Sequence, residues 1–284
     1  MSRYGEYEVV APLASGGMGG VYLARHVTSG EAVALKVLDP AFASHPEVVR
    51  RLYSECAIAT RATHPGLVSI RGAGKTTDDI PYLVMEYLDG RTIADIINDG
   101  VMPVEDVIGL GAQIASALAA LHDARIVHCD VKPENVVVLT ARAWGTLPQV
   151  KVIDFGVSRP LDEPTPDDAS IAGTPAYMAP EQWKGRPQLA SDVYAFGCVL
   201  YELLTGDSPF GGSLPEMMMA HFEQRPARIT WLRTGVPIDL ERLVMRALAK
   251  DPAMRPTMAD LALELGDLAA TLAATDTMPI ALAV

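Results

Sequence analysis

The sequence predicts an α+β fold with two lobes, a small one made of strands and one main helix and a larger one that is mostly helical. Short β-type runs surround a single helical segment in residues 1–85, whereas apolar residues recur at helical spacing through much of residues 91–272. The length of 284 residues is at the upper end for one domain and also suits two lobes that share a cleft, and roughly three quarters of the unfolded surface can be buried at that length.

The composition is that of a globular protein, with 49% hydrophobic and 20% charged residues. The net charge of −12 argues against nucleic acid or an anionic membrane as the main partner, but not against a nucleotide, which local donors and cations can bind. Cys56, Cys129 and Cys198 lack paired spacing, which favours a reducing compartment. With no signal segment at the start and no apolar run long enough to span a bilayer, we expect a cytoplasmic chain without a membrane segment.

In the small lobe, the alternation of apolar residues predicts strands at 7–13, 21–26 and 33–38, then a helix at 46–63 with Pro46 near its start. Two further strands are predicted at 67–70 and 81–86, with a polar turn at 72–79 between them. In the large lobe, helical spacing predicts helices at 104–121, from Asp192 onward, and at 214–222, 238–249 and 257–272.

The segment from Ala14 to Gly20 is rich in glycine and lies between the first two predicted strands. Glycines let backbone amides approach phosphate groups closely, although a plain hairpin turn has the same composition. Lys36 lies inside an apolar strand, where a buried ammonium group needs a partner. Glu55 in the predicted helix is the candidate, and the alternative is one more solvated charge on that helix.

The stretch from Ile126 to Gly156 places polar groups between two apolar runs. Asp130, Asn135 and Asp154 fall where a strand ends or a loop begins, so the scaffold can aim them into a common site. Two carboxylates and an amide suit Mg²⁺ bound together with phosphate oxygens, because this ion takes few protein ligands.

The patterns His-x-Asp-x-x-x-x-Asn at 128–135, Asp-Phe-Gly at 154–156, Val-Ala-Leu-Lys at 33–36 and Gly-Thr-Pro-Ala-Tyr-Met-Ala-Pro-Glu at 173–181 resemble those of the eukaryotic-like serine/threonine protein kinases of bacteria. The resemblance covers about residues 7–270. It implies a kinase domain at 1–272, with an antiparallel-sheet lobe at 1–85, a hinge at 86–90 and a helical lobe at 91–272, followed by a tail at 273–284.

By this resemblance the chain would bind ATP and Mg²⁺ and phosphorylate serine or threonine hydroxyls of proteins, itself included. Lys36 would hold the α- and β-phosphates and Glu55 would fix Lys36. The other nucleotide-binding positions follow from the motifs: Ala14, Gly16, Gly17 and Gly19 in the loop, Val21 and Ala34 as apolar walls, Met85 as gatekeeper, and the backbone of Glu86 and Leu88.

For catalysis, the resemblance implies that Asp130 orients the acceptor hydroxyl and takes its proton, while Lys132 neutralises charge on the transferred group. Thr174 would bridge these two residues, and Asn135 and Asp154 would hold the metal. Two alternatives stay open. A small-molecule phosphotransferase would normally lack the segment at 173–181, and an inactive nucleotide-binding scaffold would bind ATP without transfer.

Three departures from the family pattern stand out. Ala14 replaces the first glycine of the loop, and Cys129 replaces the arginine that normally pairs with phosphate on the activation segment, here residues 154–181. We therefore hypothesise that activity does not depend on phosphorylation of this segment, with Thr165 and Ser170 as the remaining candidate sites. The third departure is an insert at 140–149, which we interpret as a longer surface hairpin, with Trp144 as an alternative partner site.

Overall fold

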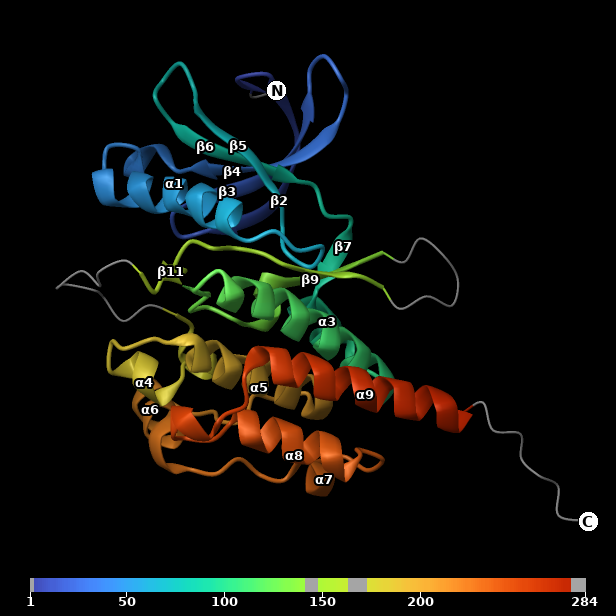
Figure 1. The fold of residues 1–284 in the computed structure, drawn as a ribbon. Helices are drawn as coiled ribbons and strands as arrows, with labels where there is room; N and C mark the ends of the chain where they lie inside the picture. The colour runs from blue at the N-terminus through green and yellow to red at the C-terminus, as the bar shows by residue number, and fades with distance from the viewer. Residues whose placement is uncertain (1–2, 141–147, 163–172, 277–284) are drawn as a thin grey trace, which may run out of the picture.

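The computed structural model describes residues 3–140, 148–162 and 173–276, and it has the two predicted lobes (Figure 1). The smaller lobe is a curled antiparallel sheet with strand order β1-β2-β3-β4-β6-β5, packed against helix α1 (Pro46–Arg61). The strands of this sheet are β1 (Arg3–Tyr4), β2 (Tyr7–Gly16), β3 (Gly19–His26), β4 (Ala32–Leu38), β5 (Ile70–Lys75) and β6 (Pro81–Glu86).

The placement of the fifth strand differs from the sequence prediction. A strand was expected at 67–70 with a polar turn after it, but β5 begins at Ile70 and continues through the segment Arg-Gly-Ala-Gly-Lys. Its pairing with β6 provides the backbone hydrogen bonds, with a register irregularity between Ile70 and Gly72. Tertiary pairing therefore overrides the low strand propensity of glycine, and residues 76–79 alone form the turn.

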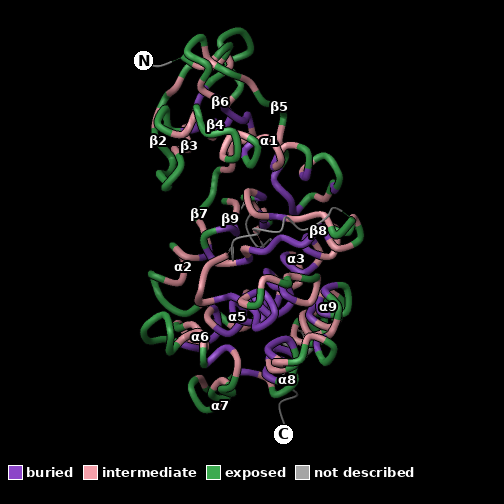
Figure 2. The backbone as a smooth tube through the Cα atoms, turned by 90° about the vertical axis from the view of Figure 1, so that its left-hand side faces the viewer, coloured by how far each residue is buried: buried purple, intermediate pink, exposed green. Residues whose placement is uncertain are grey.

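The larger lobe is helical, with α3 and α5 at its centre and α9 packed along α3 (Figure 1). Figure 2 shows the buried backbone concentrated in this lobe, whereas the outer strands of the small lobe are exposed. Its helices are α2 (Ile93–Asp99), α3 (Val104–Asp123), α4 (Pro180–Trp183), α5 (Leu189–Thr205), α6 (Leu214–Glu223), α7 (Ile229–Leu232), α8 (Ile238–Ala247) and α9 (Met258–Asp276).

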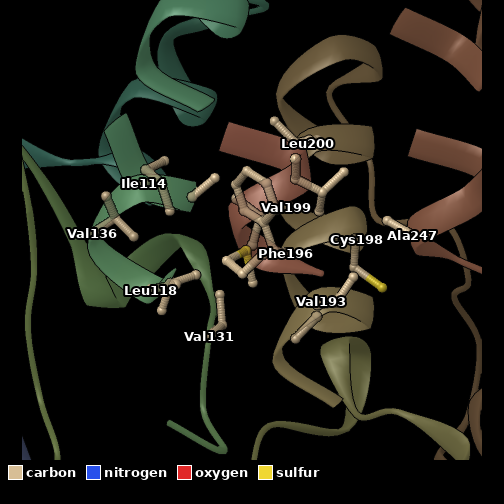
Figure 3. Close-up of a cluster of buried hydrophobic side chains, with 14 of the residues drawn as sticks. Ile114, Leu118, Val131, Val136, Val193, Phe196, Cys198, Val199, Leu200 and Ala247 are labelled. Carbon is tan, nitrogen blue, oxygen red and sulfur yellow. The ribbon is translucent and has the colours of Figure 1, made fainter. Parts of the chain in front are cut away.

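Short strands at the top of the large lobe carry the loops of the candidate site. They form the ladders β10-β9-β7 and β11-β8, from β7 (Gly90–Thr92), β8 (Ile126–Val127), β9 (Val136–Leu139), β10 (Val150–Val152) and β11 (Arg159–Pro160). Figure 3 shows Val131 and Val136 in one apolar cluster with Leu118 of α3 and Phe196 of α5. The loop between β8 and β9 is thus anchored directly to the core.

Helix α3 is the one described helix long and apolar enough to span a membrane. Half of its most apolar stretch is buried, and Ile114 and Leu118 belong to the core of the large lobe (Figure 3). Its apolar character is therefore accounted for by packing against α5 and α9.

Candidate active site

Four of the residues predicted to bind a nucleotide share one face of the small-lobe sheet. Val21 pairs with Lys36 across β3 and β4, and Ala34 pairs with Met85 across β4 and β6. Directly paired residues project to the same side of a sheet, and Ala34 and Lys36 are two positions apart on one strand. The register alone therefore aligns the apolar walls, the gatekeeper position and the lysine on a single surface.

Lys36 joins the two lobes through an ion-pair cluster. Its Nζ donates to both carboxylate oxygens of Glu55 on α1, at 2.7 and 2.9 Å, and to Oδ1 of Asp154, at 2.9 Å. The Glu55 side chain is nearly buried, whereas that of Asp154 is 43% exposed. The predicted pairing of Lys36 with Glu55 is present, and Asp154 is added to it.

The environment of this cluster shifts its protonation equilibria. Burial raises the pKa of the Glu55 carboxyl to about 7, although Lys36 acts in the opposite direction. Burial acts to lower the pKa of Lys36, but Glu55 and Asp154 outweigh it and raise that pKa. For Asp154 burial is outweighed by Lys36 and by the Gly156 amide, so its pKa is lowered and the carboxylate stays ionised.

The glycine-rich segment is a tight hairpin closed by the pair Gly16 and Gly19. A side chain at Gly19 would collide with the carbonyl oxygen of Val37, so the fold itself requires that glycine. At Gly17 nothing lies within 4 Å of an added Cβ, and at Gly16 only a backbone oxygen at 3.8 Å does. Neither has a backbone conformation that excludes other residues, so their glycines suit the close approach of a ligand.

Asp130 lies at the centre of a hydrogen-bonded group in the loop between β8 and β9. The Thr174 hydroxyl donates to Asp130 Oδ1 at 2.8 Å, and Lys132 Nζ lies 2.8 Å from Oδ2. Lys132 also donates to Thr174 Oγ1 at 2.9 Å, and the Asn135 amide donates to the Asp130 carbonyl at 2.9 Å. The predicted bridge from Thr174 to Asp130 and Lys132 is therefore present, and Asn135 is hydrogen-bonded to Asp130 beside it.

The backbone of this loop is held by the buried Asp192 of α5. Its carboxylate accepts the amide hydrogens of His128 and Cys129, at 2.8 and 2.9 Å, and lies 2.9 Å from His122 Nε2. Cys129 has a φ of +66°, a conformation that non-glycine residues adopt only when the surroundings hold it. Asp192 thus supports the strained turn that places Asp130.

The second loop places Asp154 by a similar device. Asp154 also has a φ of +66°, and the buried Phe155 packs edge-on against His128 at a ring separation of 5.8 Å. Farther out, Glu181 pairs with Arg255 at 2.6 Å, which fixes residues 173–181 to the large lobe.

Asn135 and Asp154 have the donor chemistry that Mg²⁺ requires. The nitrogen of the Asn135 amide is committed to Asp130, which leaves the Oδ1 oxygen for a cation. Asp154 is ionised, and among the described residues its hydrogen bonds are made by Oδ1 and not by its second oxygen. One carboxylate oxygen and one amide oxygen fit a magnesium ion, because this ion takes its remaining ligands from water and phosphate oxygens.

Two contacts of this region were not foreseen from the sequence. The side chain of Glu86, expected to matter only through its backbone, forms an ion pair with Lys151 of β10. Arg61 of α1 binds Asp162 with 2.8 and 3.0 Å contacts. The spacing of charges along the chain gives no signal for pairs so distant in sequence. Trp144, Thr165 and Ser170 lie outside the described residues.

Comparison with known proteins agrees with this geometry. Residues 7–264 match the family described as protein kinase domain, and the chain belongs to that family. The predicted fold and the family resemblance are thereby confirmed. The crystal structure of a double mutant of the PknI kinase domain from Mycobacterium tuberculosis is similar, with a TM-score of 0.70 at 27% identity, covering 94% of this chain and 97% of that one.

Among curated relatives, the serine/threonine-protein kinase PknB of Mycobacterium leprae is 38% identical over 257 residues, which cover 88% of this chain and 40% of the relative. The serine/threonine-protein kinase PrkC of Bacillus subtilis is 36% identical over 256 residues, or 88% of this chain and 38% of that protein. The chain therefore spans about two fifths of the length of these relatives.

Proposed function

We propose that this chain is a serine/threonine protein kinase domain that transfers the γ-phosphoryl group of ATP to protein hydroxyls, in cytoplasmic signalling. The observation that carries the proposal is the joint presence of two preassembled groups. Lys36, Glu55 and Asp154 are in contact across the two lobes, and Asp130, Lys132 and Thr174 are in contact within the large lobe. The names of the relatives support the same activity.

On the nucleotide side, Lys36 binds the α- and β-phosphates while Glu55 keeps its ammonium group in place. The adenine lies against the face that carries Val21, Ala34 and Met85, and the backbone at Glu86 and Leu88 binds its edge. The hairpin that contains Gly16 and Gly17 covers the phosphates with backbone amides. Asn135 and Asp154 would hold Mg²⁺, which would supply charge neutralisation on the phosphate oxygens.

On the acceptor side, Asp130 orients the serine or threonine hydroxyl and accepts its proton. Hydrogen bonds from Thr174 and Asn135 fix the carboxylate in one orientation, so little reorganisation is needed during transfer. Lys132 lies next to Thr174 and Asp130 and stabilises negative charge on the transferred phosphoryl group.

Activity is further proposed to be independent of phosphorylation in residues 154–181. The buried thiol of Cys129 cannot bind a phosphate group, and Asp162 supplies a permanent negative charge to Arg61 of α1. A carboxylate therefore makes the contact to the helix that carries Glu55. If phosphatase treatment removed most of the activity and rephosphorylation restored it, this part of the proposal would be wrong.

The experiment is a transfer assay with labelled ATP, Mg²⁺ and a generic basic protein. The parent is expected to produce phosphoserine or phosphothreonine, whereas Asp130→Asn and Lys36→Met should lose at least about a hundredfold in rate. Arg242→Met, which removes an exposed charge on α8, is the control. Nucleotide binding without transfer by the parent would instead favour the inactive scaffold, and transfer only to small molecules would favour the other alternative.

A further inference from the structure

Glu86, the last residue of β6, has a side chain held by two segments distant in sequence. Its Oε1 accepts a hydrogen bond from Lys151 Nζ at 2.7 Å and another from the Ser69 amide at 2.7 Å. Lys151 also donates to the Leu67 carbonyl at 3.2 Å. One carboxylate and one ammonium group therefore connect the end of β6, residues 67–69 and strand β10.

Each of these three segments leads directly to a part of the candidate site. Strand β6 carries Met85 and continues into the hinge, β10 is followed at once by the loop of Asp154, and residues 67–69 follow the helix of Glu55. Backbone hydrogen bonds run beside the ion pair. The Val152 amide donates to the Gly66 carbonyl at 2.7 Å, and the Val68 amide donates to the Val152 carbonyl at 3.0 Å. The Glu86 amide donates to the Ser69 carbonyl at 3.0 Å.

The setting of this pair distinguishes it from a surface ion pair of the small lobe. The side chains of Lys151 and Glu86 are 14% and 21% exposed, whereas those of Lys75 and Asp79 are 51% and 86% exposed. Exposed pairs of the second kind contribute little. Removal of one partner from a largely buried pair leaves the other charge poorly solvated, so the local backbone rearranges to reach water or a new partner.

We propose that Lys151 and Glu86 are a positioning pair that fixes the hinge relative to the Asp154 loop, and so sets the affinity for the nucleotide. The inference rests on the proposed function, because it assumes that the adenine binds at the hinge and the phosphates near Asp154. Lys151 is not among the residues predicted to contact the adenine or the phosphates. It acts by holding the two backbone segments at the separation that one nucleotide must span, where small misplacements weaken binding.

The test is the dissociation constant of Mg–ATP, measured by calorimetry on the full chain. Lys151→Met is expected to raise it about tenfold and Glu86→Gln about threefold, with the KM for the protein acceptor unchanged. The double variant should resemble Lys151→Met alone, because both changes remove one interaction. Lys151→Arg, which keeps the charge, should remain near the parent, and so should the control Lys75→Met.

Unchanged nucleotide affinity in Lys151→Met and Glu86→Gln, even with a lowered melting temperature, would show a purely structural pair and overturn the inference. An equal loss in Lys75→Met would do the same. If Lys151→Met fails to fold, the comparison of Glu86→Gln with Lys151→Arg decides in its place. A parent that binds no Mg–ATP would contradict the proposed function itself, and that result is distinguishable from the others.

Discussion

Two ion pairs of nearly equal length occupy different settings in the two lobes. Arg255 and Glu181 are 2.6 Å apart in the large lobe, and the guanidinium side chain is fully buried. Lys36 and Glu55 are 2.7 Å apart in the small lobe, with 27% of the lysine side chain exposed. Arg255 also donates to the carbonyls of Ala249, Ala190 and Lys250, so its hydrogen-bonding capacity is used within the protein.

The small-lobe pair has a different balance of charge. Lys36 faces two carboxylates, and among the described residues one oxygen of Asp154 accepts no hydrogen bond. The cluster therefore carries excess negative charge next to an unused carboxylate oxygen of Asp154, and a cation bound to that oxygen would balance the charge. We call an ion pair saturated when all its hydrogen-bonding groups are used within the protein, and unsaturated when an oxygen beside it is left unused. The comparison teaches that a saturated ion pair serves the fold, whereas an unsaturated one marks the place where a ligand binds.

The saturated pair should give the largest effect on stability. Arg255→Met leaves the buried Glu181 carboxylate without its cation, and we expect a loss of about 3–5 kcal/mol in the free energy of unfolding. Urea denaturation measures it. Arg242→Met, at an exposed pair on α8, should change the value by less than about 0.5 kcal/mol. If Arg255→Met lost as little free energy of unfolding as Arg242→Met, the Arg255–Glu181 pair would contribute no more to stability than an exposed pair, which would contradict this prediction.

The unsaturated pair should respond to pH. Because the folded-state pKa of Glu55 is about 7, against an ordinary value of 4.5, its stabilising contribution is fully present below pH 4.5 and is lost as pH rises through 7. Binding has the opposite sign, since the ionised carboxylate holds Lys36. Nucleotide affinity should fall about tenfold from pH 8 to pH 6.

Calorimetric titration across this range measures that dependence. Glu55→Gln is expected to bind the nucleotide weakly and with little change between pH 6 and pH 8, because the titrating group is gone. If this variant kept the pH dependence of the parent, a different group would be responsible for it.

Sequence reasoning anticipated individual contacts of the candidate site, such as Lys36–Glu55 and Thr174–Asp130, better than the boundaries of some elements. The residues of the β8–β9 loop and of Asp-Phe-Gly are close in the chain, and their spacing fixes the chemistry wherever the surrounding strands lie. Strand β5 was misplaced because its glycines indicate a turn and only the pairing with β6 makes it a strand. The Lys151–Glu86 contact joins residues 65 positions apart, so no local pattern could indicate it.

The exposed contact between α1 and the activation segment should give the smallest effect. The Arg61 and Asp162 side chains are 34% and 53% exposed. Asp162→Asn should therefore lower kcat by about threefold at low salt and by less at high salt. Initial rates at two ionic strengths measure it, and a loss of a hundredfold would show that this contact controls the position of Glu55.

The most direct test of the account is the shift in melting temperature that Mg–ATP produces in the parent and in Lys36→Met. If the cluster of Lys36, Glu55 and Asp154 serves binding rather than folding, the two proteins should melt within a few degrees of each other without nucleotide. Only the parent should then gain stability when Mg–ATP is added. An equal gain in Lys36→Met, or an unfolded variant, would contradict the account.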